Sequence, residues 1–367
     1  MKKASILPHE LIDQILSESV LLKQDLCNIA LASRAFCTLA RPYLFETVTI
    51  ECAYCTDESD PAAARALTHD AQRRLRFFRD HAALAALVRV AHRVDGGETF
   101  KPGDPAYEVE EIGRIWDAVY AVLPKLEEVH DGFLAPPLSS SLPPCTSSLR
   151  HVGTPWLTSD AWRWLSQCRK LRSLHCSFTS EDSPSLPSPL PFSLEHIRLD
   201  DLYGNPTLFL GLLTSSRSTL RSLDLCGRLA ILTDFSGLPA LEKLTLSVCG
   251  GQGKADPAHE QSLVRASLPT LMKLRTLVVV QHVSWRRAGG VFDVIAHPDI
   301  VALLPKSLER IECDDEPTLE DCQSLFGNGT SVRVLGVRGR ADMVRDTTEA
   351  REWCEERGIV WRDARLP

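Results

Sequence analysis

The stretch that decides the fold is LRSLDLCG at residues 220–227, with LEKLTLSV following at residues 241–248. In both stretches leucine stands at the first, fourth and sixth positions. The last two leucines flank one polar residue, and side chains two positions apart point to the same face of a β-strand. Each stretch therefore predicts a short strand with one buried face.

The same pattern occurs nine times after residue 120. Its leading residues are Leu126, Leu149, Leu171, Leu194, Leu220, Leu241, Leu274, Leu308 and Val332. Seven of the nine are followed by apolar residues at both the fourth and the sixth position, and the first two at the fourth only. Successive leading residues are 21 to 26 positions apart, except for two steps of 33 and 34. This spacing resembles leucine-rich repeats of 20–29 residues with two insertions. The asparagine that usually follows the strand is missing, as Cys226-Gly227 shows.

Helices are predicted between the strands. Apolar residues recur every three or four positions over residues 112–123, 162–168 and 319–325, as on one face of a helix. Near the end, residues 342–357 form a similar pattern that Gly358 stops. We therefore expect an α/β fold, an irregular leucine-rich-repeat-like horseshoe with a parallel sheet on its concave side. An ordinary α/β domain with a closed sheet is the alternative.

The N-terminal stretch has a different character. Residues 7–45 read LPHELIDQILSESVLLKQDLCNIALASRAFCTLARPYLF. They predict three short helices, the first opening at Leu7-Pro8, the second capped by Asp25 and the third ending before Pro42. A unit of about 40 residues rarely buries enough apolar surface alone. We therefore expect a partner to cover part of it.

This stretch resembles the F-box. The likeness rests on Leu7-Pro8-His9-Glu10-Leu11-Ile12, on Asp25-Leu26, and on Arg34 with Phe36, where the family often has tryptophan. It implies a three-helix F-box that docks onto the Skp adaptor of a Skp–cullin–F-box ubiquitin ligase, and through it onto cullin. A helical cap on a larger domain is the alternative. The residues expected to bind the adaptor are Leu7, Pro8, Leu11, Ile12, Ile15, Leu16, Leu26, Leu31 and Leu39.

These patterns suggest three domains. Residues 1–47 would be the F-box, and residues 48–83 a bridging segment with a helix over 61–81. Residues 84–367 would be the repeat domain, opened by a degenerate strand over 84–90. Together they resemble the F-box/leucine-rich-repeat proteins of filamentous fungi.

Sequence motifs for catalysis or metal binding are missing. There is no G-x-S-x-G, H-E-x-x-H or phosphate-loop motif, and the one C-x-x-C (Cys52 to Cys55) has no second pair at zinc spacing. We expect no catalytic residue, metal or cofactor. A net charge of −7 and the lack of a long apolar stretch argue against nucleic-acid and membrane partners and favour the cytoplasm or nucleus.

Polar residues that flank the buried positions of each strand should point away from the core. They would form a surface for an unidentified protein substrate, made of His175, His196, Arg198, Asp200, Asp224, Lys243, Thr245, Arg310, Glu312 and Asp314. We therefore expect the chain to be the substrate receptor of a ubiquitin ligase and not itself an enzyme. Two alternatives stay open: an F-box scaffold that acts without ubiquitylation, and an enzyme with an unrecognised site.

Overall fold

The computed structural model divides into two compact units, residues 1–171 and 172–367. The described residues are 9–17, 22–52, 61–95, 105–130, 142–154, 159–176, 190–200, 206–226, 235–248, 267–281, 301–313, 316–327, 330–337 and 347–363.

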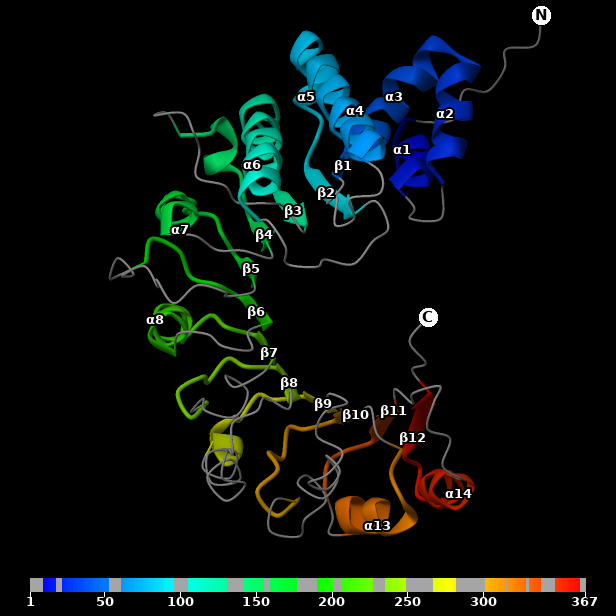
Figure 1. Cartoon of the computed structure of the whole chain (residues 1–367). Coiled ribbons are helices and arrows are strands. Elements are labelled where there is room, and N and C mark those ends of the chain that lie inside the picture. Colours follow the sequence, from blue (N-terminus) through cyan, green and yellow to red (C-terminus); the bar gives the residue numbers. More distant parts are fainter. Residues whose placement is uncertain are drawn as a thin grey trace, which may run out of the picture. The chain divides into compact units, whose positions relative to one another are not determined.

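Unit 1 begins with three helices and continues with strands that alternate with helices (Figure 1). Its elements are α1 (His9–Ser17), α2 (Lys23–Ala32), α3 (Arg34–Phe45), β1 (Thr47–Cys52), α4 (Pro61–Asp80), α5 (Ala82–Ala85), β2 (Val90–Asp95), α6 (Pro105–Val122), β3 (Glu128–His130), the 3-10 helix η1 (Pro144–Ser147), β4 (His151–Thr154) and α7 (Ser159–Leu165). The four strands pair in chain order and all pairs are parallel. Figure 1 shows α4 and α6 on the same side of these strands.

Unit 2 repeats the arrangement with eight parallel strands in chain order. Its described elements are β5 (Ser173–Cys176), β6 (His196–Asp200), α8 (Pro206–Ser216), β7 (Ser222–Cys226), β8 (Lys243–Val248), the 3-10 helix η2 (Leu268–Thr270), β9 (Thr276–Gln281), β10 (Arg310–Cys313), α13 (Leu319–Gly327), β11 (Val334–Val337), α14 (Thr348–Glu356) and β12 (Val360–Asp363). Among the described strands, β12 pairs only with β11, as β1 does with β2 in unit 1. The sheet is therefore not closed, and the closed-sheet alternative is wrong.

The repeat pattern predicted the strands correctly. Each of the nine repeats contains a strand that starts one residue before its fourth position, as β7 does before Leu223. In unit 2 the fourth positions lie side by side across the sheet and are buried: Leu174, Ile197, Leu223, Leu244, Leu277, Ile311 and Leu335. The expected α/β fold with a parallel sheet is confirmed.

The start of the sheet differs from the prediction. Residues 84–90 are not a strand, because α5 covers the first two and β2 begins only at Val90. The first strand is β1, inside the stretch interpreted as a bridge, and its Val48 and Ile50 are buried. β1 escapes the leucine pattern because β-branched residues form its buried face. The helix predicted over 61–81 is confirmed as α4.

Two helix ends were also predicted wrongly. Helix α2 begins at Lys23, and Asp25 lies in its first turn, where its carboxylate accepts a hydrogen bond of 3.0 Å from the N–H of Leu22. Helix α3 continues past Pro42 to Phe45 although proline removes one helical hydrogen bond. The turn after Pro42 packs Leu44 against the helical core and Phe45 against α4, which offsets that loss.

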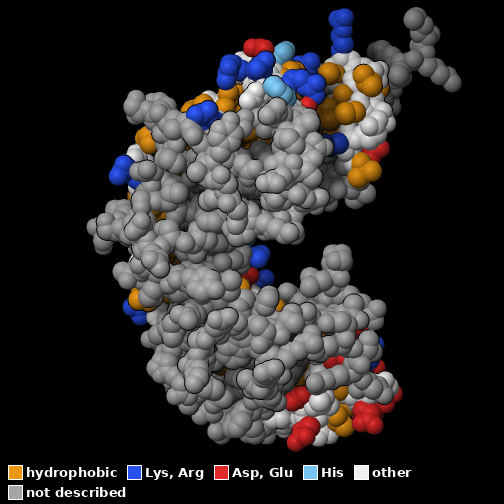
Figure 2. Space-filling view, in the orientation of Figure 1, with side chains coloured by type: hydrophobic (Ala, Val, Ile, Leu, Met, Phe, Trp, Pro, Cys, Tyr) orange, Lys and Arg blue, Asp and Glu red, His pale blue; other side chains and the backbone are white. Residues whose placement is uncertain are grey.

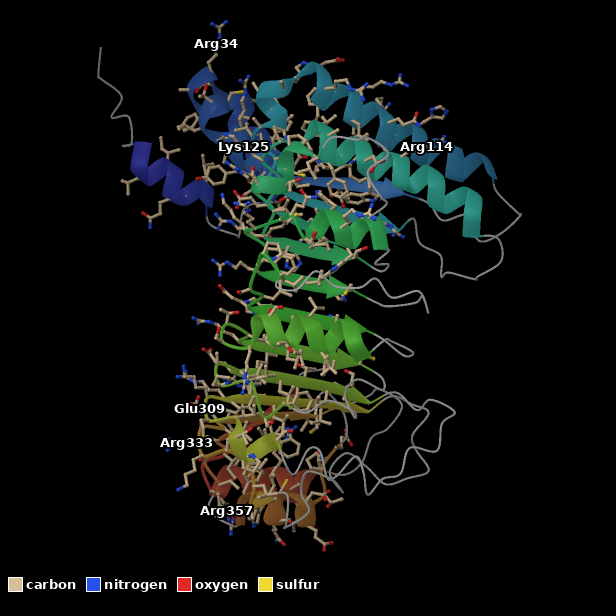
Figure 3. All side chains as sticks on the ribbon, turned by 90° about the vertical axis from the view of Figure 1, so that its left-hand side faces the viewer. Arg34, Arg114, Lys125, Glu309, Arg333 and Arg357 are labelled. Atoms are coloured by element: carbon tan, nitrogen blue, oxygen red, sulfur yellow. The ribbon has the colours of Figure 1, made fainter. Side chains whose placement is uncertain are left out.

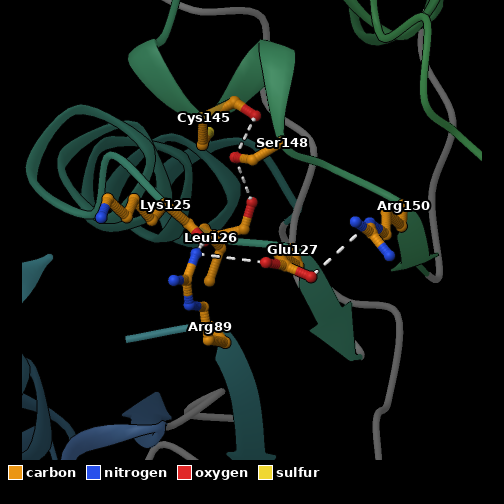
Figure 4. A network of polar contacts seen from close by, with 7 residues as sticks. All are labelled: Arg89, Lys125, Leu126, Glu127, Cys145, Ser148 and Arg150. Atoms are coloured by element: carbon orange, nitrogen blue, oxygen red, sulfur yellow. Dashed lines mark hydrogen bonds and ion pairs between the residues drawn. The ribbon is translucent and has the colours of Figure 1, made fainter. Parts of the chain in front are cut away.

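Arginine and glutamate alternate where the strands begin. In unit 1 the residue just before each of the strands β2, β3 and β4 is charged, in the order Arg89, Glu127 and Arg150. Glu127 forms ion pairs with both arginines, at 3.1 Å to Arg89 and 3.6 Å to Arg150 (Figure 4). In unit 2 the order is Arg172, Glu195, Arg221, Glu242, Arg275, Glu309 and Arg333, joined by backbone hydrogen bonds from each N–H to the preceding carbonyl. Figure 3 shows Glu309 and Arg333 at one edge of this sheet. From β2 to β4 and from β5 to β11, neighbouring strands thus begin beside opposite charges, which favours the observed pairing order.

Serine and threonine hydroxyls link neighbouring repeats. The hydroxyl just before a leading leucine donates to the carbonyl of the preceding leading leucine. This occurs from Ser148 to Leu126 at 2.8 Å (Figure 4), from Thr219 to Leu194 at 2.9 Å and from Ser307 to Leu274 at 2.8 Å. Buried carbonyls that no strand neighbour reaches are satisfied in this way.

Candidate protein-interaction sites

The first site lies on helices α1, α2 and α3. Ile12, Leu16 and Leu26 are buried against one another and form a small helical core. The side chains packed around this core are Ile29, Phe36, Leu39, Tyr43 and Leu44. The helices therefore hold each other in place with only part of their apolar surface.

The remaining apolar side chains of α1 and α2 are exposed. Leu11 and Ile15 lie one turn apart on α1 and expose 46% and 49% of their surface. Leu22, at the start of α2, exposes 70%, and Leu31, at its end, exposes 85%. Figure 2 shows hydrophobic side chains gathered on this part of the surface. We call Leu11, Ile15, Leu22 and Leu31 the apolar face.

Helix α3 and β1 connect the helical core to the rest of unit 1. The ring of Phe45 stacks on Phe77 and meets Phe78 edge-on, with 6.4 Å between centroids in each case. Lys23 on α2 donates to the carbonyl of Thr47 in β1 at 3.2 Å. Leu75 and Phe78 of α4 are buried beneath these contacts. The apolar face is thus carried on helices that are anchored to a sheet.

The nine predicted adaptor-binding residues fall into distinct groups. Leu11, Ile15 and Leu31 are exposed, whereas Ile12, Leu16 and Leu26 are buried within the helical core and cannot reach a partner from there. Leu39 is half-buried. Leu7 and Pro8 lie outside the described residues. Leu22 was not among the predicted residues, and the structure shows that it is exposed beside the start of α2.

The second site lies on the face of the unit 2 sheet that carries the predicted substrate-binding residues. The strand register places His175, Arg198, Asp224 and Thr245 side by side on β5 to β8. A second row, one step toward the strand beginnings, contains His196 and Lys243 on either side of Ser222. Parallel pairing in chain order therefore brings these residues together as expected.

Two of the predicted substrate-binding residues are buried, which corrects the expectation that they point into solvent. Thr245 and Glu312 expose only 7% of their surface, and Val278, between them in the register, exposes none. Gly336, next to Glu312, explains part of this burial. A Cβ on Gly336 would lie 2.9 Å from the Glu312 side chain, so the carboxylate side chain lies directly over the glycine.

Charge on this face is partly paired. Arg198 and Asp224 form an ion pair at 4.0 Å, and Arg310 pairs with Glu312 at 2.6 Å. His196, Arg198 and Lys243 are exposed, His175 and Asp224 are half-buried, and the side chains of Asp200 and Asp314 lie outside the described part of the chain. Among the predicted residues whose side chains are described over β6 to β8, both exposed charges, Arg198 and Lys243, are therefore positive.

A row of histidines on unit 1 was not predicted. The rings of His92 and His130 stack with 4.5 Å between centroids, and His151 adds a third ring at 4.5 Å from His130. His130 also contacts the carboxylate of Glu128 at 3.2 Å. The sequence scatters these histidines over 60 positions, so only the register of β2, β3 and β4 brings them together.

Buried titratable groups in the described residues belong to the core. Burial raises the pKa of the Cys145 and Cys168 thiols to about 12 and raises that of the Tyr120 phenol well above its usual value. In the part of the chain that the structure describes, no cluster of three or more histidine, cysteine or acidic side chains has a geometry that could hold a metal ion. Within the same residues, no helix is both long and apolar enough to cross a bilayer.

Comparison with known proteins does not identify a family for this chain. No protein-family model matches the sequence, and no curated protein matches it.

Proposed function

We propose that this chain is the substrate receptor of a Skp–cullin–F-box ubiquitin ligase. In this proposal residues 1–47 act as the F-box, and an irregular leucine-rich-repeat-like horseshoe carries the target on its inner sheet. The observation that supports it best is the apolar face, whose four large side chains stay exposed on anchored helices. Within this set Leu11 and Ile15 lie one turn apart on α1, and exposed apolar side chains that lie together are typical of a protein-binding surface.

The two apolar stripes of α1, one buried and one exposed, support the same proposal. Ile12 and Leu16 face the helical core, while Leu11 and Ile15 form the neighbouring stripe that the chain leaves open. A helix that served only as a cap would bury its apolar stripe against the domain and expose polar residues. The exposed stripe is what a Skp-type adaptor would cover, with cullin bound through the adaptor.

The receptor supplies no catalytic group in this proposal. It holds the target beside the ubiquitin-carrying enzyme, and positioning alone accelerates a transfer between two bound partners. The exposed groups of the second site, His196, Arg198 and Lys243, would pair with complementary charges on the target. Such a receptor would work in the cytoplasm or nucleus, where the ligase acts.

The first prediction tests adaptor binding with purified Skp-type adaptor. Leu11→Asp and Ile15→Asp should each weaken capture by at least about tenfold, because a carboxylate would be buried in an apolar interface. Leu210→Asp is the matched control, since Leu210 on α8 is exposed to a similar extent but lies in unit 2. The three variants should show the same circular dichroism and melting temperature.

Two results would count against the receptor. One is that the wild-type chain captures no adaptor, and the other is that all three variants bind it equally well. If capture is normal but reconstituted ligase transfers no ubiquitin to captured targets, the chain is a scaffold that uses the adaptor for another purpose.

A further inference from the structure

One row of side chains on the unit 2 sheet consists of residues that can all donate hydrogen bonds. It is formed by the first residue of each strand from β5 to β10, and the strand register places these residues side by side. We call this set the donor row: Ser173, His196, Ser222, Lys243, Thr276 and Arg310. None of its members is a carboxylate, so the row suits a partner that supplies acceptors.

The donor row lies on the face of the sheet opposite to the buried leucines. Each member directly precedes a buried fourth position of the repeat, as Ser222 precedes Leu223, so its side chain points the other way. His196 and Lys243 are exposed, and the other four are half-buried. The row ends at β11, where Val334 takes the equivalent position. The donors thus form one line across six neighbouring strands.

The described carboxylates on this face of unit 2 are paired. One step further along the strands, Asp224 pairs with Arg198 at 4.0 Å, and Glu312 pairs with Arg310 at 2.6 Å. Lys243, by contrast, forms no ion pair with any described residue. The donor row therefore retains an uncompensated positive charge near its centre.

Nitrogen donors and hydroxyls alternate along the donor row. His196, Lys243 and Arg310 stand on β6, β8 and β10, and Ser222 and Thr276 stand on the strands between them. Neighbouring strands lie about 4.8 Å apart, so the nitrogen donors repeat about every 9.6 Å. A polyproline II helix has three residues per turn and rises about 3.1 Å per residue, so every third side chain repeats about every 9.3 Å on one side. The two spacings match.

We propose that the donor row binds an acidic segment of the target in a polyproline II conformation, with a carboxylate at every third residue. The carboxylates accept hydrogen bonds from His196, Lys243 and Arg310. The hydroxyls between them donate to backbone carbonyls of the segment, which a polyproline II helix leaves unpaired. This inference names the class of target for the second site, and it rests on the proposed receptor function only for the role of the bound segment.

The composition of the row favours an acidic peptide over a nucleic acid. Nucleic-acid binding depends on many lysines and arginines, because each neutralised phosphate releases a counterion. The donor row contains one lysine and one arginine, and the arginine already pairs with Glu312. Three of its six members are uncharged hydroxyls, which suit backbone carbonyls better than a chain of phosphates.

The experiment measures the binding of fluorescein-labelled peptides to the full chain by fluorescence anisotropy at low ionic strength. Four repeats of glutamate-proline-alanine place a carboxylate at every third position, and the same repeats with glutamine remove the charge. A third peptide has the composition of the first but carries its glutamates next to one another. The evenly spaced acidic peptide should bind, the glutamine peptide at least about tenfold more weakly, and the third peptide at least about threefold more weakly.

Substitutions at lysine test whether the donor row is the binding site. Lys243→Glu should weaken binding of the evenly spaced peptide by at least about tenfold, because it replaces a donor with a repelling carboxylate. Lys243→Gln removes only the charge and should give a smaller loss. Lys273→Glu is the matched control, since Lys273 is exposed in the turn before Leu274, outside the strands. It should leave binding unchanged, and all three variants should melt at the wild-type temperature.

The proposal is overturned if the evenly spaced peptide binds no better than the glutamine peptide or the peptide with adjacent glutamates. It is equally overturned if Lys273→Glu weakens binding as much as Lys243→Glu does, or if a single-stranded RNA of equal net charge binds more tightly than the peptide.

Adaptor capture by the same preparation separates this inference from the proposed function. Captured adaptor without peptide binding removes the role of the donor row and leaves the receptor in place. Peptide binding without captured adaptor supports the donor row and removes the link to the ligase.

Discussion

Tyr120 carries a buried hydroxyl for which the described structure offers no hydrogen-bond partner. Its ring packs beside Trp164 and Trp116, at centroid distances of 4.7 and 5.8 Å. Trp164 differs, because its indole N–H donates to the hydroxyl of Thr146 at 2.9 Å. The buried polar group of Tyr120 is thus unpaired, whereas that of Trp164 is paired with Thr146. Substitutions at Tyr120 and at Thr146 test this difference.

We predict that Tyr120→Phe stabilises the protein by about 1 kcal/mol, since it removes an unpaired buried polar group and keeps the ring. Thr146→Val, the matched control, should destabilise it by about 1–3 kcal/mol because it leaves the Trp164 N–H unpaired. Urea unfolding at pH 7 measures both. Equal signs for the two variants would contradict this account.

The raised pKa of Tyr120 also predicts a dependence on alkaline pH. The folded state keeps the phenol protonated, whereas the unfolded chain releases the proton near pH 10. The unfolded state therefore binds fewer protons above pH 10, and stability falls there as pH rises, by up to about 1.4 kcal/mol per pH unit. The difference in unfolding free energy between wild type and Tyr120→Phe should be constant below pH 10 and widen above it.

At the scale of the element, side-chain hydroxyls form hydrogen bonds between neighbouring repeats. The carbonyls of Leu126, Leu194 and Leu274 would be left without partners if Ser148, Thr219 and Ser307 did not donate to them. The sequence does not indicate these hydrogen bonds, because serine and threonine are common in loops and carry no periodic signal by themselves. The bonds become visible only when neighbouring strands are stacked.

We expect Thr219→Val to cost about 1–2 kcal/mol of stability, because a buried carbonyl loses its donor while the side-chain volume is kept. Thr214→Val on α8 is the control, since the hydroxyl of Thr214 bonds only within its own helix and is exposed. Its cost should stay within about 0.5 kcal/mol. Thermal melting of both variants distinguishes a structural hydroxyl from an incidental one.

At the scale of the whole molecule, the proposed receptor has two independent binding surfaces. One is the apolar face on α1 and α2, and the other is the exposed charge of Arg198 and Lys243 on β6 and β8. They belong to different compact units of the chain. Substitutions at one surface should therefore leave the other intact.

Proximity labelling in cells tests this independence. Leu11→Asp/Ile15→Asp should lose the adaptor and cullin from the labelled set but keep the target proteins. Arg198→Glu/Lys243→Glu should show the reverse, because reversing the charge repels a complementary partner. Loss of both groups with either variant would mean that the surfaces do not act separately.

Much of the architecture was readable from the residues. The leucine positions predicted all nine repeat strands, because alternation of apolar residues depends only on residues close in sequence. Stacking of the repeats then places these strands side by side. Helix α4 and the stripe of α6 were predicted for the same reason. The missed strand β1 has valine and isoleucine at its buried positions, and the misplaced ends of α2 and α3 depended on packing that no local pattern encodes.

The amino-acid sequence by itself determined the elements, because periodic apolar residues specify which face of each strand or helix must be buried. Only the tertiary structure decided which residues remain accessible. It buried Ile12, Leu16, Thr245 and Glu312, and it exposed Leu22. The physical reason is that exposure and contact depend on neighbours distant in the chain, whereas periodicity depends only on residues close in sequence.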